Sequence, residues 1–231
     1  GHDLTELYAV SDLRRSLLPR ELGSEDVPGM DGALFTGARL GVRTTTLTLT
    51  ARAKDMGRRQ QLARQLAEIL NVSEPRPLQV SIDDGLWLMA VPSSGTDATR
   101  WLNATSFEVE FVSHDPLMRG DERTVTVPSG GSVTFTVGGS APTMPLVAAP
   151  AARDGSGGAW ILTLDGGMYL AASVPSAAAL EADCEGRTLT VNGETALLRP
   201  DADWLVLEPG MHTLAMTGTG AASVKFTERW V

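Results

Sequence analysis

The sequence predicts a mainly β protein with one α-helix, organised as two domains. Residues 56–70 have apolar side chains at helical spacing, whereas most other apolar segments alternate with a period of two. Beyond residue 118, short alternating segments are separated by turn residues about every ten positions. A chain of 231 residues can build two modest cores. We therefore expect a β-rich domain with a packed helix over residues 1–118 and a β-sandwich over residues 119–231.

The first elements are extended segments joined by a defined turn. Residues 7–18 have the mixed character of an extended arm or an edge strand. In residues 25–33, Pro28 fixes its own φ and Gly29 permits a positive φ, which predicts a sharp loop. Residues 39–52 then alternate threonine with apolar residues, as a β-strand does. Because polar residues occupy both faces, our hypothesis is that one side of this strand lies against a neighbouring chain.

A helix follows, with Asp55 placed as its N-cap and residues 56–70 as its body. Its apolar side consists of Leu62, Leu66, Ile69 and Leu70. The wetter faces are expected to carry Arg58, Arg59, Arg64 and Gln65. A helix packed on antiparallel strands is the simplest assembly for this half of the chain.

Further strands complete the first domain. Residues 78–82 and 86–91 flank an Asp-Asp-Gly sequence, which predicts a β-hairpin. Residues 101–114 predict a strand with Phe107 and Val109 on one face and glutamates on the other.

Composition excludes several classes of function. The net charge is −9 and no basic stripe is present, so specific binding of nucleic acid is not expected. Lysine occurs only at Lys54 and Lys225, and no apolar run approaches a membrane span, so membrane attachment or insertion is not expected. The single cysteine, Cys184, fits folding in a reducing cytoplasm, where we expect it to be a small buried side chain.

No pattern of catalytic or metal-binding residues is present. The three histidines show no metal-ligand spacing, and Asp83-Asp84 lacks the ligand count of a calcium loop. Residues 218–223 superficially resemble a dinucleotide-binding loop but precede no helix, and no phosphate-binding Gly-Lys-Ser or Gly-Lys-Thr element occurs. We therefore expect no catalytic residue, no metal site, no cofactor and no enzymatic activity.

Tryptophans in the second domain raise an alternative function. Exposed aromatic rings on a β-sandwich can stack on sugars, which would make this domain a carbohydrate-binding module for host cell-wall saccharide. The candidate contacts are Trp160 and Trp204. Burial in the core is the default interpretation of such residues.

Short motifs in a particular order carry a family resemblance. They are Asp3-Leu4, residues 13–19 (Leu-Arg-Arg-Ser-Leu-Leu-Pro), residues 25–33 (Glu-Asp-Val-Pro-Gly-Met-Asp-Gly-Ala), residues 111–116 (Phe-Val-Ser-His-Asp-Pro), residues 207–210 (Leu-Glu-Pro-Gly) and residues 228–230 (Glu-Arg-Trp). In this order and spacing, over nearly the whole chain, they resemble the distal tail proteins of long, non-contractile-tailed bacteriophages, the siphophages.

The resemblance implies a structural adaptor at the virion tail tip, encoded by a phage or prophage and made in the bacterial host cytoplasm. Six copies would form a ring, with galectin-like C-terminal domains projecting outward. The ring would join the tail tube protein to the tail-associated hub protein, lie near the tape-measure protein and carry receptor-binding proteins in some relatives. DNA would pass through its channel without specific binding. The candidate subunit contacts are Arg14, Arg15, Pro28, Gly29, Thr44, Thr46 and Thr48.

Overall fold

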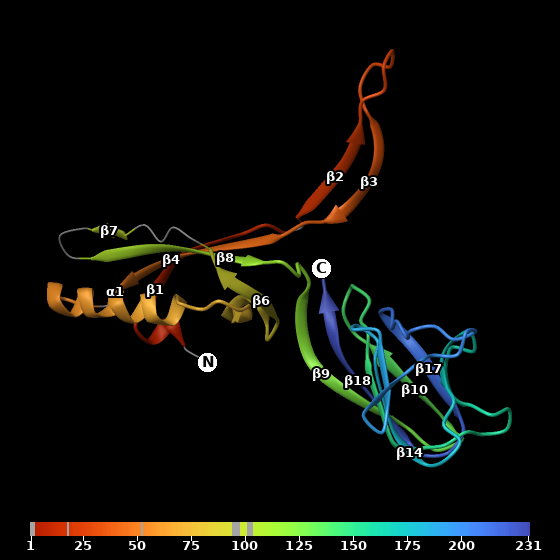
Figure 1. The fold of residues 1–231 in the computed structure, drawn as a ribbon. Helices are drawn as coiled ribbons and strands as arrows, with labels where there is room; N and C mark the ends of the chain where they lie inside the picture. The colour runs from red at the N-terminus through yellow and green to blue at the C-terminus, as the bar shows by residue number, and fades with distance from the viewer. Residues whose placement is uncertain (1–2, 18, 52, 94–97, 101–103) are drawn as a thin grey trace. The chain divides into compact units, whose positions relative to one another are not determined.

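A computed structural model describes residues 3–17, 19–51, 53–93, 98–100 and 104–231. The chain folds into two compact units, residues 1–116 and 117–231 (Figure 1). The sequence placed the division at 118/119. In the structure the units divide between Pro116 and Leu117, and Met118 already begins a strand of the second unit, where it pairs with Trp230.

The first unit contains one α-helix and eight strands among its described residues. Their order is η1 (Leu4–Glu6), β1 (Tyr8–Arg15), β2 (Arg20–Glu25), β3 (Leu34–Leu40), β4 (Arg43–Ala51), α1 (Met56–Leu70), β5 (Arg76–Gln79), η2 (Ser81–Asp83), β6 (Trp87–Pro92), β7 (Ala98–Arg100) and β8 (Thr105–Ser113). The predicted helix is confirmed, and Asp55 caps it by accepting a hydrogen bond of 2.7 Å from the Arg58 amide.

The sheet of this unit places β4 between β1 and β8, both antiparallel to it. Strands β6 and β7 pair with the other side of β8. Both edges of β4 are therefore occupied within the chain, so only a face of this strand is left for a neighbour. The predicted strand over residues 101–114 begins at Thr105, and residues 101–103 lie outside the described part.

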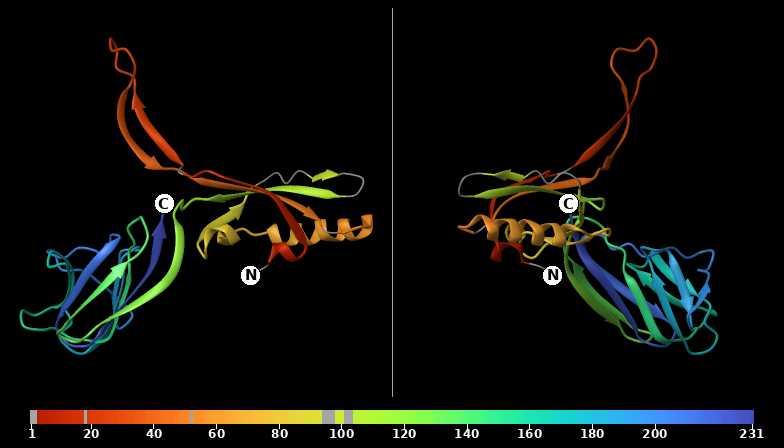
Figure 2. Two further views of the ribbon diagram at one scale, coloured as in Figure 1. Left: turned by 180° about the vertical axis from the view of Figure 1, so that it is seen from behind. Right: turned by 60° about the vertical axis from the view of Figure 1, so that its left-hand side comes forward.

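Helix α1 covers one face of this sheet, as Figure 2 shows from two further sides. Leu62 and Leu66 of the helix form a core with Leu47 and Leu49 of β4. Arg59 is buried on the same side, so the expectation that it lies on a wet face is wrong. The reason is its position, because residues 59, 62 and 66 share the i, i+3, i+7 spacing of one helix face.

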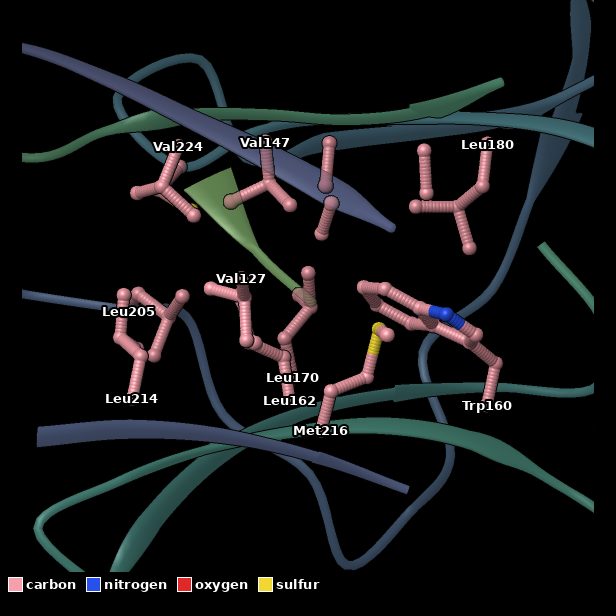
Figure 3. Packing of buried hydrophobic residues seen from close by; sticks show 14 of the residues in the cluster. Val127, Val147, Trp160, Leu162, Leu170, Leu180, Leu205, Leu214, Met216 and Val224 are labelled. Carbon is pink, nitrogen blue, oxygen red and sulfur yellow. The ribbon is translucent and has the colours of Figure 1, made fainter. Parts of the chain in front are cut away.

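The second unit is a β-sandwich. Its strands are β9 (Met118–Val127), β10 (Ser132–Val137), β11 (Leu146–Ala152), β12 (Trp160–Leu164), β13 (Met168–Ala172), β14 (Ala178–Asp183), β15 (Thr188–Val191), β16 (Glu194–Ala196), β17 (Gly210–Thr217) and β18 (Ala222–Trp230). One sheet has the order β9-β18-β11-β14-β15-β16 and the other β10-β17-β12-β13. Side chains of both sheets interdigitate in one core, where Met216 points toward the indole of Trp160 (Figure 3).

Candidate assembly surface

Strands β2 and β3 form a two-stranded arm, residues 20–40, that stands apart from the sheet carrying α1 (Figures 1 and 2). Every residue of the arm except Gly37 is exposed, and Gly37 is half-buried. Leu22 keeps 69% and Phe35 64% of their surface in solvent. An isolated two-stranded hairpin is marginally stable in water, and exposed apolar residues gathered on one element mark an interaction site. The arm is therefore the candidate assembly surface of this chain.

The tip of the arm is a tight turn, as the sequence predicts. The amide of Met30 donates to the Val27 carbonyl at 3.1 Å, which closes a four-residue turn with Pro28 and Gly29 at its centre. Gly29 has φ +82°, the conformation for which glycine is needed here. The proposed contact residues Pro28 and Gly29 thus lie exposed at the far end of the arm.

A partly buried ion pair joins the end of β1 to η2, near the root of the arm. Arg15, at the end of β1, donates two hydrogen bonds of 2.6 and 2.7 Å to the carboxylate of Asp83. Only 7% of the Asp83 side chain is exposed. These hydrogen bonds raise the pKa of Arg15 above its usual range. The sequence proposed Arg15 as a subunit contact, and in the structure its guanidinium forms this ion pair within the chain.

Arg43 adds a second anchor at the same place. It is buried, and its guanidinium donates to the carbonyl of Leu17 at 2.9 Å, in the connection between β1 and β2. Burial lowers the pKa of Arg43, and the neighbouring charge of Arg15 lowers it further. The sequence did not predict the role of Asp83 or of Arg43. Asp83 pairs with a residue that lies 68 positions away along the chain. The sequence does carry one signal: arginines end β1 and begin β4.

The other proposed contacts lie on the body of the first unit. Arg14 is exposed and pairs with Asp12 at 2.8 Å. Thr44, Thr46 and Thr48 are half-exposed on the face of β4 away from the helix-side core. Their cross-strand partners on β8 are Val112, Glu110 and Glu108. This face is therefore rich in hydroxyl and carboxylate groups.

The two candidate sugar contacts of the second unit differ in exposure. Trp160 has no exposed surface, so a sugar cannot stack on it in this fold. Trp204 is half-buried and packs against the same core. Burial, the default interpretation, thus holds for Trp160. The carbohydrate-binding alternative is left with Trp204 as its candidate contact.

The Glu-Arg-Trp motif, residues 228–230, joins the end of β18 to neighbouring loops of the second unit. The Glu228 carboxylate accepts a hydrogen bond of 3.0 Å from the Gly138 amide, and the Arg229 side chain pairs with Glu185. The Arg229 carbonyl accepts hydrogen bonds from Ser140 and Ala141. A side chain at Gly139 would collide with that carbonyl, so this close approach requires glycine.

His212 connects two loops at one end of the sandwich. Its Nδ1 lies 2.6 Å from Asp165 Oδ2 and its Nε2 lies 2.6 Å from the Glu208 carbonyl oxygen. Both partners are acceptors, so the doubly protonated imidazolium satisfies them best. Partial burial opposes the charged form, but the hydrogen bonds to Asp165 and Glu208 outweigh it and raise the pKa of His212.

This geometry predicts a pH dependence of the second unit. A raised pKa in the folded state stabilises the fold fully below about pH 6.5, and the contribution fades as pH rises through the folded pKa. We expect His212→Gln to lower the unfolding free energy by about 1 to 2 kcal/mol at pH 6 and by less at pH 8. Urea denaturation at both pH values measures this, with an NMR titration of His212 as the direct readout. An equal loss at both pH values would contradict it.

Three further observations concern metal binding, the cysteine and membrane spans. In the described part of the chain, no group of three or more His, Cys, Asp and Glu side chains is arranged to hold a metal ion. Cys184 is free and buried, as expected, and burial raises the pKa of its thiol to about 11. None of the described helices is both long and apolar enough to cross a bilayer.

Comparison with known proteins identifies both units. Residues 2–113 match a family model described as a phage tail protein RIFT-related domain, and residues 138–230 match the siphovirus-type tail component, C-terminal domain. The fold is similar to the crystal structure of the Dit protein of phage SPP1, described as a paradigm of the hub adsorption apparatus in phages that infect Gram-positive bacteria. The TM-score is 0.82 at 21% identity, over 100% of this chain and 97% of that one.

More distant similarities are to two structures of the phage P2 baseplate in its activated conformation. The structure with Ca has a TM-score of 0.46 at 9% identity over 98% of this chain and 92% of that one. The structure with Sr has a TM-score of 0.44 at 9% identity over 92% and 88%. No curated protein matches the chain. The two matched domains and the fold shared over the full length show that this chain belongs to the distal tail protein family of siphophages.

Proposed function

We propose that this chain is a non-enzymatic adaptor at the distal end of a phage tail. Six copies form a ring that links the tail tube protein to the tail-associated hub protein and leaves a channel for DNA. The observation that carries this proposal is the exposed arm. Because its apolar side chains are exposed in the single chain, an assembly that covers them gains stability from their burial.

The polar face of the first unit supports a role around passing DNA. Thr46 and Thr48 lie opposite Glu110 and Glu108 on β8. Their partners on β1 are Arg14 and Asp12, which pair with each other, so this face presents hydroxyl groups and more negative than positive charge. The whole chain carries a net charge of −9. A surface of this kind repels phosphate groups, whereas a basic lining would bind them and slow the DNA. The adaptor would act at the virion tail tip, beside the tape-measure and receptor-binding proteins, after synthesis in the host cytoplasm.

An armless variant tests the ring. Arg20 pairs with Leu40, so residues 21–39 can be replaced by Asn-Gly, which closes a two-residue hairpin between these two positions. We expect the wild-type chain to form particles of six times its 24.4 kDa mass, and the armless chain to stay monomeric with its helix and sandwich intact. Mass photometry and averaged electron micrographs measure this, with circular dichroism as the folding control.

Two outcomes would contradict the proposal. The first is a wild-type chain that remains monomeric at high concentration, even with its tube partner added. The second is an armless chain that still forms six-fold particles, which would remove the arm from the ring contact.

A further inference from the structure

The hairpin of β15 and β16 has an Asn-Gly turn. Asn192 and Gly193 alone join the two strands, with φ of +52° and +79°, as in a type I′ turn. Both residues are exposed. Asn192 precedes a glycine, whereas Asn71 precedes valine and Asn103 precedes alanine. Because glycine has no Cβ, its backbone nitrogen can approach the preceding carboxamide with the least steric hindrance.

The fold holds the carboxamide of Asn192 but not the nitrogen that could attack it. The Asn192 amide donates to the Ala179 carbonyl at 2.7 Å, and Asn192 Oδ1 accepts from the Ala179 amide at 2.9 Å. Closure of a five-membered ring on Gly193 requires rotation of the Asn192 side chain and backbone, so these two bonds must break first. The Gly193 amide itself donates to no group in the described part of the chain.

The end of this hairpin is a place where local opening is expected. Asn192 and Ala179 lie one step beyond Val191 and Leu180, the last pair of the β14–β15 ladder. Strand β16 has only three residues, Glu194–Ala196, and lies at the end of its sheet. Opening such an edge element requires far less free energy than unfolding the whole sandwich. The turn can therefore leave Ala179 while the core stays folded.

We propose that Asn192 is a site of spontaneous deamidation, which the two bonds to Ala179 slow and opening of the hairpin end permits. In the open state the Gly193 nitrogen attacks Cγ of Asn192. The N–Cγ bond forms, the Cγ–Nδ2 bond breaks, and ammonia leaves with the proton of the Gly193 amide. Water then adds to either carbonyl of the succinimide and opens the ring, which gives aspartate or isoaspartate at position 192.

The two products have different consequences for the fold. Aspartate keeps an oxygen that can accept from the Ala179 amide, and it tolerates a positive φ, so the hairpin should persist. Isoaspartate adds one carbon to the main chain, which the two-residue turn does not accommodate. The pairing of Leu189 with Ala196 should then be lost. Leu189, a core residue with 2% of its surface exposed, would become accessible to water.

Peptide mass spectrometry of the full chain, incubated at mildly alkaline pH, tests the site. Base speeds the reaction because the Gly193 amide must lose its proton. We expect deamidation at Asn192 well before Asn71 or Asn103, and several-fold more slowly in the native chain than in the urea-unfolded chain. Urea below the unfolding transition should change the native rate little, because local opening exposes little surface.

Two variants separate the roles of the turn and of Ala179. Ala179→Pro removes the N–H that holds Asn192 Oδ1, and we expect several-fold faster deamidation of the native chain, with circular dichroism as the folding control. Asn192→Asp reproduces one product and is the matched control for the other. The isoaspartate fraction should lose hydrogen-exchange protection in β16, whereas Asn192→Asp should keep it, a comparison that does not depend on the folding of Ala179→Pro.

Three results would overturn the proposal. Equal rates in the native and unfolded chains would show that Ala179 does not protect Asn192. A native rate that rises with urea in step with global unfolding would exclude local opening. An unmodified Asn192 in the native chain, after the unfolded chain has been fully converted, would remove the site. None of these results bears on the adaptor function, which does not depend on this turn.

Discussion

Replacing Asp83 by alanine is expected to lower the unfolding free energy of the first unit by about 3 kcal/mol, because it leaves a half-buried arginine without its counter-charge. Without Asp83, the Arg15 guanidinium would be only partly hydrated and would lie close to the positive charge of the buried Arg43. The segment that leads into the arm should also become more mobile. Hydrogen exchange followed by mass spectrometry measures both effects, since it reports the first unit and the arm separately.

The exposed pair on the same strand is the control. Arg14→Ala breaks an ion pair with Asp12 of similar length, but 73% of the Arg14 side chain is in solvent. Such pairs contribute at most about 1 kcal/mol, so this variant should resemble the wild type. Equal effects of Asp83→Ala and Arg14→Ala would show that burial of the Asp83 carboxylate does not matter.

Replacing Trp160 by alanine is expected to lower the unfolding free energy of the second unit by about 3 to 5 kcal/mol. The side chain is fully buried between the two sheets, and its removal leaves a cavity lined by neighbours such as Met216 (Figure 3). The two units have separate cores, so hydrogen exchange in the first unit should stay unchanged.

A graded series gives this prediction its control. Trp160→Phe keeps most of the apolar contact and removes an indole N–H that has no hydrogen-bond partner among the described residues, so its cost should stay below about 1.5 kcal/mol. Trp204→Ala, at a half-buried position, should fall between the two. Urea denaturation followed by circular dichroism ranks the three variants. A Trp160→Ala protein as stable as the wild type would contradict the assigned core.

Local features of the structure could be predicted from sequence because their causes are local. Helix α1 spans the predicted residues, since an N-cap aspartate and apolar side chains at helical spacing act within a few turns. The Val27–Met30 turn follows from Pro28 and Gly29 in the same way. The Asp-Asp-Gly hairpin is present, but β5 ends at Gln79 and a 3₁₀ turn fills the connection.

The alternation of β4 also predicted its strand, but not its surroundings. Period two tells which residues share a face, and Leu47 and Leu49 do share the buried one. It cannot tell which strands pair on either side. In the structure β1 and β8 take both edges, so the neighbouring chain that the threonines suggested has only their face to contact.

The sequence by itself determined the fold class, the helix, the tip turn and the family motifs, because each depends on residues that are close along the chain. Only the tertiary structure decided that Asp83 pairs with Arg15, that Arg59 and Trp160 are buried, and that the arm stands uncovered. The physical reason is that burial and ion pairing depend on which distant segments meet. Residues 15 and 83 meet through the packing of the whole first unit, and no local pattern encodes that contact.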